Sequence, residues 1–320
     1  MSAYLDVRDL SKTYSGQGGS AVRALDEVSL TLDRGEVLGI VGESGCGKST
    51  LGRAILRLVE PSGGRVLVED EDLLGLGSAG LKARRRDLQI IFQDPFGSLN
   101  PRHKVGAIIR EPLDVHGVGT RRERAARVDE LIRLVGLSEA ARARYPHEFS
   151  GGQRQRIAIA RALALDPKLI VADEPVSALD VSIQSQIINL IVSLRERLGL
   201  SMLFISHDLS VIRHVSDRIA VMYLGRIVET GTVGGIMDEP LHPYTQALLS
   251  AIPRPRAEGR RPRIVLKGEL PDPANPPTGC AFHTRCPAAM PQCSVDRPAL
   301  VPRRAQAVVR TTACHLYEVA

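Results

Sequence analysis

Residues 36–50 read Glu36-Val37-Leu38-Gly39-Ile40-Val41-Gly42-Glu43-Ser44-Gly45-Cys46-Gly47-Lys48-Ser49-Thr50. The part before Gly42 is an almost continuous apolar run, which is typical of a buried parallel strand that leads into a loop. Three glycines follow within the next six residues, and a helix is expected to begin near Ser49. The stretch therefore predicts a strand, a glycine-rich loop and a helix in succession.

The glycine-rich loop has the spacing G-x-x-x-x-G-K-[ST], counted from Gly42 to Ser49. Glycines allow backbone N–H groups to converge on phosphate oxygens, and the following helix N-terminus favours anions. Lys48 is expected to pair with the β- and γ-phosphates and Ser49 to bind Mg²⁺. The alternative is a glycine turn that matches by accident. The candidate nucleotide-binding residues here are Gly42, Glu43, Ser44, Gly45, Cys46, Gly47, Lys48, Ser49 and Thr50.

A second apolar run, Leu169-Ile170-Val171-Ala172, ends in two neighbouring carboxylates, Asp173 and Glu174. At a strand end two carboxylates can divide the work: Asp173 would hold Mg²⁺, directly or through water, and Glu174 would polarise the attacking water. A surface acidic pair is the alternative, but it would not need the apolar run before it.

Further patterns predict the surrounding elements. Residues 28–32 alternate as a half-buried strand, 202–205 form another buried strand, and 219–228 are expected to form a hairpin turning at Leu224-Gly225. Between residues 100 and 149 the pattern becomes helical, with Gly136 as a stop after four apolar residues at helical spacing: Val128, Leu131, Ile132 and Val135.

Another small-residue stretch, Ser150-Gly151-Gly152-Gln153, precedes a helix expected over 157–165. A Ser-Gly-Gly sequence at a helix start is a second anion site. One nucleotide has little use for two such sites in one chain. The arrangement makes sense if the second site serves the nucleotide of another copy.

These motifs together resemble the ATP-binding-cassette (ABC) ATPases over residues 1–235, with Ser150–Gln153 as the signature motif. The resemblance implies that Gln93 contacts Mg²⁺ and couples hydrolysis to a permease, and that Asp180 lies in a loop that communicates with the opposite subunit of a dimer. It also implies that His207 contacts the γ-phosphate and that Tyr14 stacks on adenine. Each residue has a purely structural alternative. In the same order, these are a loop amide, a helix cap, a structural histidine and a residue of a small secondary core. Every catalytic position of the family's motifs carries the expected residue. The chain is therefore expected to hydrolyse ATP, with Lys48, Gln93, Glu174 and His207 as its catalytic residues.

The resemblance also implies an α/β fold of the P-loop NTPase (RecA-like) type with an antiparallel β subdomain. The expected divisions are a nucleotide-binding core at 1–95 and 166–235, an inserted α-helical signature subdomain at 96–165, and a small cysteine-containing C-terminal extension at 236–320. Two subunits would close head to tail, so that Ser150 and Gly152 of one cover the phosphate held by Lys48 of the other.

Three further stretches, at 92–102, 145–149 and 242–253, resemble the ATPases of oligopeptide and dipeptide importers, more closely the second ATPase subunit. That implies a partner ATPase (a related chain or a second copy), two transmembrane permease subunits and an extracytoplasmic substrate-binding protein. Related importers carry nickel chelates, glutathione or oligosaccharides, so the cargo stays open. A non-transport ABC ATPase would carry a second cassette or a coiled-coil insertion, and neither is visible.

Bulk composition limits the partners. The net charge of +6 is modest, aromatics make up 3%, and the arginine clusters at 84–86, 121–124 and 254–263 alternate with no aromatic residue. We therefore expect solvated helix faces and a linker rather than a nucleic-acid site. With no signal segment or spanning run visible, the chain is expected at the cytoplasmic face of the membrane, as a peripheral subunit.

Four of the five cysteines, Cys280, Cys286, Cys293 and Cys314, lie in the terminal unit. A lasting disulfide is disfavoured in the cytoplasm. The open alternatives are a [4Fe–4S] cluster, a structural Zn²⁺, and free buried thiols. The C-terminal segment resembles that of peptide-importer ATPases, and for some of these the resemblance implies a [4Fe–4S] cluster. His283 and His315 are possible substitute ligands, and more often such histidines are plain surface residues.

Overall fold

The computed structural model describes residues 3–15, 21–252, 264–266, 268–305 and 308–317. The chain divides into two compact units. The first comprises Met1–Leu32, Val37–Leu74 and Ser206–Ala320, and the second comprises Asp33–Glu36 and Gly75–Ile205. The arginine-rich stretch 254–263 and Pro253 lie outside the described residues.

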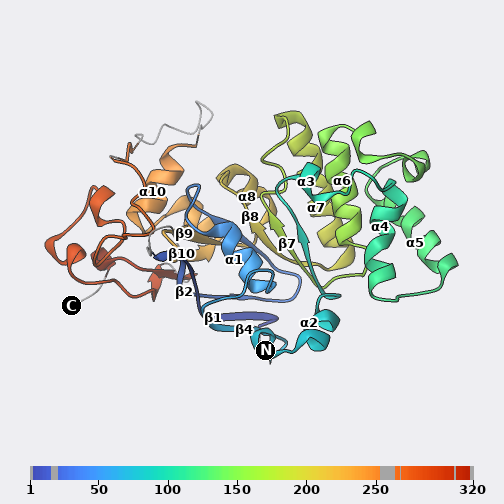
Figure 1. The fold of residues 1–320 in the computed structure, drawn as a ribbon. Coiled ribbons are helices and arrows are strands. Elements are labelled where there is room, and N and C mark those ends of the chain that lie inside the picture. Colours follow the sequence, from blue (N-terminus) through green and yellow to red (C-terminus); the bar gives the residue numbers. More distant parts are fainter. Residues whose placement is uncertain (1–2, 16–20, 253–263, 267, 306–307, 318–320) are drawn as a thin grey trace. The chain divides into compact units, whose positions relative to one another are not determined.

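The first unit contains an antiparallel sheet in the strand order β2-β1-β4-β5 (Figure 1). Its strands are β1 (Leu5–Ser15), β2 (Ala21–Leu32), β4 (Gly63–Val68) and β5 (Glu71–Asp72). Along β2, Val28, Leu30 and Leu32 are buried while the residues between them are exposed. The alternation predicted for 28–32 is confirmed, because one face of this sheet is buried and the other faces solvent.

The same unit contains the neighbouring strands β11-β12-β10-β9-β3. The pairing of β3 (Val37–Val41) with β9 (Arg218–Tyr223) is parallel, and β3 is buried at every position. β9 pairs antiparallel with β10 (Arg226–Thr232) across a two-residue turn in which Leu224 and Gly225 both have positive φ, 42° and 77°. This is the turn geometry that right-twisted hairpins prefer, and it lies where the sequence predicted it.

The C-terminal segment extends this sheet. β12 (Val308–Thr312) pairs antiparallel with β10 and with β11 (Val301–Ala305). Arg310 on β12 is 2% exposed and donates to the carbonyl of Gly235 at 2.6 Å. The sequence did not predict these two strands. The helices of this unit are α1 (Lys48–Ile55), α8 (Leu209–Val215), α9 (Val233–Asp238) and α10 (Pro243–Ser250).

The second unit contains three neighbouring parallel strands, β6 (Leu88–Ile91), β7 (Leu169–Asp173) and β8 (Ser201–Ile205). β7 and β8 are buried along their whole length. Both were predicted as buried strands from their apolar runs.

Helices make up most of the rest of the second unit. They are α2 (Ser78–Arg84), α3 (Pro95–Ser98), α4 (Val105–Val115), α5 (Arg121–Leu134), α6 (Gly151–Ala162) and α7 (Val181–Leu198). Figure 1 shows α4, α5 and α6 packed side by side. α5 buries Val128, Leu131 and Ile132, and the chain leaves it at Gly136 with φ 72°. The predicted helix and its stop are therefore confirmed.

Two of the arginine clusters lie on helices or beside them and form ion pairs. Arg84 lies 3.8 Å from Asp87, and Arg124 lies 2.7 Å from Asp114. These are exposed or half-buried pairs, which contribute little to stability individually. Their geometry matches the solvated helix faces expected from the sequence.

Candidate functional site: a phosphate loop, a carboxylate strand end and a signature helix

The phosphate loop of the first unit joins β3 to α1 and packs closely on two other strands. A Cβ on Gly42 would lie 2.2 Å from the carbonyl oxygen of Met222, and one on Gly47 would lie 2.3 Å from that of Ala24. Gly47 also has φ 104° at the N-cap of α1. Only glycine fits at these two positions, because any side chain would collide with backbone.

Lys48 is the first residue of α1 and is 4% exposed. Its ammonium donates to the carbonyl oxygens of Gly42 at 2.8 Å and Glu43 at 2.9 Å. The loop is thus wrapped around a buried positive charge at a helix N-terminus. This arrangement suits a phosphate group, which would bring negative charge to the same place.

Cys46 is buried, at 1% exposure. Burial raises the pKa of its thiol above the ordinary value, because the thiolate would lose its hydration. The loop therefore does not expose Cys46, and its thiol is a poor target for alkylation at neutral pH.

Slow alkylation of Cys46 follows as a prediction. A raised pKa lowers the thiolate fraction at neutral pH, and the thiolate is the reactive form. We expect iodoacetamide to label Cys46 at least about tenfold more slowly in the folded chain than in guanidine, with the rate rising toward alkaline pH. Mass spectrometry of the Cys46 peptide measures this. Equal labelling rates in the folded and unfolded chains would contradict the burial.

In the second unit, β7 ends at Asp173, which is 1% exposed. Glu174 follows with φ 46°, a left-handed conformation that costs energy for a residue with a side chain. Its N–H donates to the carbonyl of Ile205 at 3.0 Å, which fixes this strained turn. Two carboxylates therefore stand in sequence where β7 ends, as the sequence predicted.

Gln93 lies in the same unit and approaches the second carboxylate. Its side-chain Nε2 donates to Oε2 of Glu174 at 3.3 Å. The structure thus brings together two of the residues that the sequence predicted for catalysis. A carboxylate held by an amide donor keeps a fixed orientation, which a group that accepts a proton from water requires.

The signature stretch forms the start of α6. Ser150 is the N-cap, and a capping box joins its hydroxyl to the N–H of Gln153 at 3.4 Å and the Gln153 side chain to the N–H of Ser150 at 3.1 Å. The helix was predicted at 157–165 but spans Gly151–Ala162. That prediction was wrong because the capping box starts the helix through two glycines, whose intrinsic helix propensity is low.

Gly152 lies where α6 meets α7. A Cβ there would lie 2.4 Å from Cγ2 of Ile183. Ser150 and Gln153 remain exposed, so the N–H end of α6 faces outward. This exposed, positively polarised helix end can receive an anion.

Three further predicted site residues, Asp180, His207 and Tyr14, have exposed side chains. Asp180 is the N-cap of α7 but makes no side-chain cap hydrogen bond. His207 is exposed in the first unit, just before the N-cap of α8 at Asp208. Tyr14 on β1 is 39% exposed, with the Lys12 ammonium 4.9 Å from its ring centre. Tyr14 is therefore not a buried core residue.

Comparison with known proteins identifies the family. Residues 25–177 match the family described as ABC transporter, and residues 228–293 match the oligopeptide/dipeptide transporter C-terminal region. The chain is 54% identical to the oligopeptide transport ATP-binding protein AppF of Bacillus subtilis (strain 168), over 98% of this chain and 97% of that protein. The chain belongs to the ABC transporter family of ATPases.

Other relatives agree. The oligopeptide transport ATP-binding protein YkfD of the same Bacillus subtilis strain, itself named as putative, is 52% identical over 98% of this chain and 95% of its own. Among solved structures, the ATP-binding cassette MJ0796, in a dimeric post-hydrolysis state bound to ADP and Pi, is 32% identical with a TM-score of 0.65. It covers 72% of this chain and 98% of its own. The P-loop ABC fold predicted from the sequence is confirmed.

The cysteine-containing part of this ABC ATPase lies in the first unit. The N–H of Cys280 donates to the carbonyl of Cys293 at 2.8 Å. Burial raises the thiol pKa of Cys280, Cys286 and Cys314. The charge of at least one other cysteine in the group raises each of these pKa values further, and that of Cys314 reaches about 11. The four thiols therefore lie in one neighbourhood.

Within the described part of the chain, however, no group of three or more His, Cys, Asp or Glu side chains is arranged to hold a metal ion. Each of the two candidate substitute ligands bonds one ring nitrogen to a backbone carbonyl at 2.9 Å: Nδ1 of His283 to that of Cys280, and Nε2 of His315 to that of Asp296. The thiols as placed do not support the iron–sulfur prediction.

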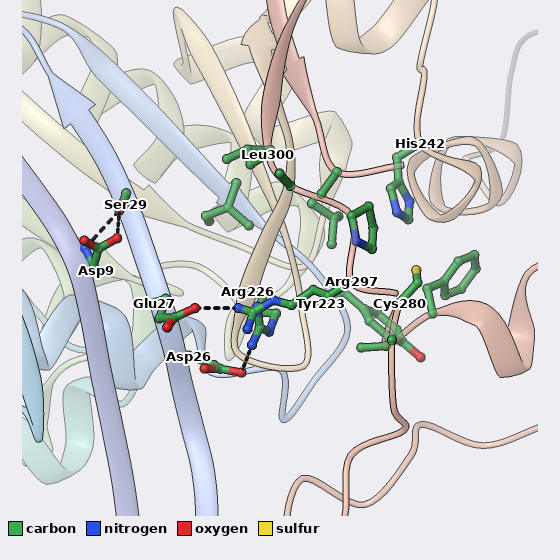
Figure 2. A pocket seen from close by; sticks show the side chains of 18 residues that line it. Asp9, Asp26, Glu27, Ser29, Tyr223, Arg226, His242, Cys280, Arg297 and Leu300 are labelled. Atoms are coloured by element: carbon green, nitrogen blue, oxygen red, sulfur yellow. Dashed lines mark hydrogen bonds and ion pairs between the residues drawn. The ribbon is translucent and has the colours of Figure 1, made fainter. Parts of the chain in front are cut away.

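A cavity of about 510 Å³ lies in the first unit beside the same cysteine-containing part (Figure 2). Figure 2 shows Asp26 and Glu27 of β2 turned toward Arg226 and Arg297. Asp26 pairs with Arg226, and Glu27 pairs with Arg297 at 2.9 Å. Asp9, a fifth charged residue of the wall, accepts a hydrogen bond from the hydroxyl of Ser29 at 3.0 Å, and most of the remaining wall is apolar.

Sequence reasoning missed two residues that contact the phosphate loop from within the first unit, Tyr244 and Arg285, and also Tyr223, whose hydroxyl accepts from Arg285 at 3.4 Å. Tyr244 belongs to the His242–Thr245 stretch that resembles peptide-importer ATPases, so the signal was present without an assigned role. Among the described residues, no helix is long and apolar enough to cross a membrane.

Proposed function

We propose that the chain is the ATP-hydrolysing subunit of an importer for dipeptides and oligopeptides. The observation that carries this is its 54% identity, over nearly its whole length, to a protein named for oligopeptide transport. The separate match of residues 228–293 to the oligopeptide/dipeptide transporter C-terminal region supports it. Nickel chelates, glutathione and oligosaccharides are the alternative cargoes.

The proposed site divides the labour among the described residues. Lys48 and the loop N–H groups bind the triphosphate, Glu174 accepts a proton from the attacking water, and Gln93 orients Glu174. His207 reaches the γ-phosphate and Tyr14 stacks on the adenine. Hydroxyl, amide and carboxylate oxygens from Ser49, Gln93 and Asp173 are the donor set that Mg²⁺ prefers. When bound, Mg²⁺ would neutralise charge on the phosphates.

The working unit is proposed to be a head-to-tail pair of ATPase subunits. The exposed N-terminus of α6, with Ser150 and Gly152, would cover the nucleotide of the opposite subunit, and Asp180 would lie across the same interface. Closure on ATP and reopening after hydrolysis would move two permease subunits at the cytoplasmic face of the membrane. An extracytoplasmic binding protein would deliver the peptide.

The domain division predicted from the sequence remains part of this proposal: core at 1–95 and 166–235, signature subdomain at 96–165, extension at 236–320. The iron–sulfur cluster stays a separate prediction with no role in the proposed mechanism. Iron and sulfide analysis after anaerobic purification tests it, and a colourless, metal-free chain would rule it out.

Cargo is tested in cells that depend on this transporter. Chromosomal Glu174→Gln should abolish uptake of a labelled tripeptide and leave unrelated amino-acid uptake unchanged. Loss of nickel, glutathione or oligosaccharide uptake with normal tripeptide uptake would replace the proposed cargo with one of these.

A role for Ser150 on the opposite subunit's nucleotide gives a further prediction. Ser150→Ala should leave the ATP affinity of the isolated chain within about twofold, yet lower ATP turnover of the assembled complex at least about tenfold. Losing the cap itself should cost about 1 kcal/mol of stability. Thr120→Ala is the matched control, because Thr120 and Glu123 form the same capping box on α5. Equal turnover in the two variants would contradict the role.

A further inference from the structure

Glu43 lies in the variable part of the phosphate loop, and its carboxylate is held by a residue 242 positions later in the chain. Arg285 donates to its two oxygens at 2.7 and 3.0 Å. The arginine side chain is 7% exposed and that of Glu43 is 29% exposed. A two-point arginine–carboxylate pair with this degree of burial is stronger and more directional than a surface ion pair.

The backbone of Glu43 is held as well. Its N–H donates to the hydroxyl of Tyr244 at 2.8 Å, and its carbonyl accepts from the Lys48 ammonium at 2.9 Å. Every polar group of this one residue therefore has a partner inside the first unit. Two of these partners, Tyr244 and Arg285, come from the C-terminal extension.

These partners are themselves fixed. Arg285 ends the short 3₁₀ turn His283–Arg285 and lies 3.4 Å from the hydroxyl of Tyr223. The Tyr223 ring packs edge-on against Tyr244 and against Phe282, with ring centres 4.7 and 5.2 Å apart. Edge-on aromatic packing is specific in geometry, so the extension presents Arg285 and Tyr244 to the loop from a rigid aromatic cluster.

We infer that Arg285 is a positioning residue for ATP binding: through Glu43, it holds the first half of the phosphate loop in the shape that receives the triphosphate. The C-terminal extension is then a structural part of the nucleotide site, in addition to any role in partner contacts. This role rests on the proposed function of the loop and of Lys48 in binding ATP.

For the variant Glu43→Gln, Coulomb attraction alone and a positioning role predict opposite changes in ATP affinity. Glu43→Gln removes a negative charge beside the phosphates and leaves Arg285 without its counter-ion, so Coulomb attraction alone would tighten ATP binding. If the pair positions the loop, the same variant binds ATP more weakly, because small misplacements of binding groups cost much affinity.

The experiment measures the Kd of the full-length chain for Mg²⁺ with a non-hydrolysable ATP analogue, by calorimetry. We expect Arg285→Ala to raise the Kd about tenfold and Glu43→Gln to raise it at least about threefold. The double variant should bind no more weakly than Arg285→Ala alone, since both changes break one interaction. Arg285→Lys keeps the charge without the two-point geometry and should fall between the parent and Arg285→Ala.

Arg297→Ala is the matched control, because Arg297 also ion-pairs from the C-terminal extension, to Glu27, without touching the loop. It should bind within about twofold of the parent. Thermal melting identifies any variant that fails to fold. Glutamine has nearly the same shape as glutamate, so the direction in which Glu43→Gln changes the Kd decides between the two explanations. Tighter or unchanged binding by Glu43→Gln, or losses that multiply in the double variant, would overturn the inference. Parental binding by Lys48→Ala would instead overturn the proposed function.

Discussion

Glu174→Gln should lower ATP turnover of the assembled transporter about 10²–10⁴-fold, the usual contribution of a positioned general base. Glutamine has nearly the same shape, and its amide oxygen can still accept the 3.3 Å hydrogen bond from Gln93. It cannot take a proton from water. ATP binding should therefore persist, and the ATP-bound pair of subunits should accumulate because the step that reopens it is blocked.

Phosphate release and size-exclusion chromatography with Mg·ATP measure the two effects of Glu174→Gln. Glu196→Gln, the same change at an exposed position of α7, serves as the control and should turn over like the parent. Turnover of Glu174→Gln at the parental rate would show that another group acts as the base.

Lys48→Ala should abolish measurable ATP binding, raising the Kd by more than about a hundredfold. Hydrogen bonds from a charged donor contribute about 1.5–3 kcal/mol each, and the ammonium is placed to make two of them with phosphate oxygens in place of its two carbonyl partners. Tenfold in Kd corresponds to about 1.4 kcal/mol, which gives the expected loss.

Thermal shift with ATP gives the simplest measurement for Lys48. The parent should melt at a higher temperature as ATP is added, because a ligand that binds only the native state stabilises it. Lys48→Ala should show no shift, while Lys82→Ala, at an exposed position of α2, should behave as the parent. A parental shift in Lys48→Ala would contradict the role of Lys48.

Short sequence patterns predicted the elements whose structure depends mainly on neighbouring residues. β3, β7 and β8 were predictable because a strand buried on both faces needs a continuous apolar run. The hairpin turn at Leu224-Gly225 was predictable from Gly225, because glycine readily adopts the positive φ that such a turn needs. The positive φ of Leu224 was not predictable, since a bulky side chain disfavours it. The phosphate loop was predictable because close backbone approach at Gly42 and Gly47 admits only glycine.

Features that depend on distant contacts were not predictable. β11 and β12 exist through pairing with β10, and Pro302 within β11 argues against a strand when read alone. The burial of Cys46 follows from its packing inside the loop, and the contact of Arg285 with Glu43 joins positions 242 residues apart. A single sequence carries no record of such pairs.

The central claim is that the phosphate loop of one subunit is completed by the signature end of α6 from the opposite one. Disulfide trapping tests it directly, with Ser44→Cys in one ATPase subunit and cysteine at Ser150, or at its equivalent in a related partner, in the other. Ser44 and Ser150 are both exposed here, and Glu196→Cys in place of the Ser150 change is the control. A crosslink that forms only with Mg·ATP is predicted; no crosslink beyond the control, in a complex that hydrolyses ATP, would contradict the account.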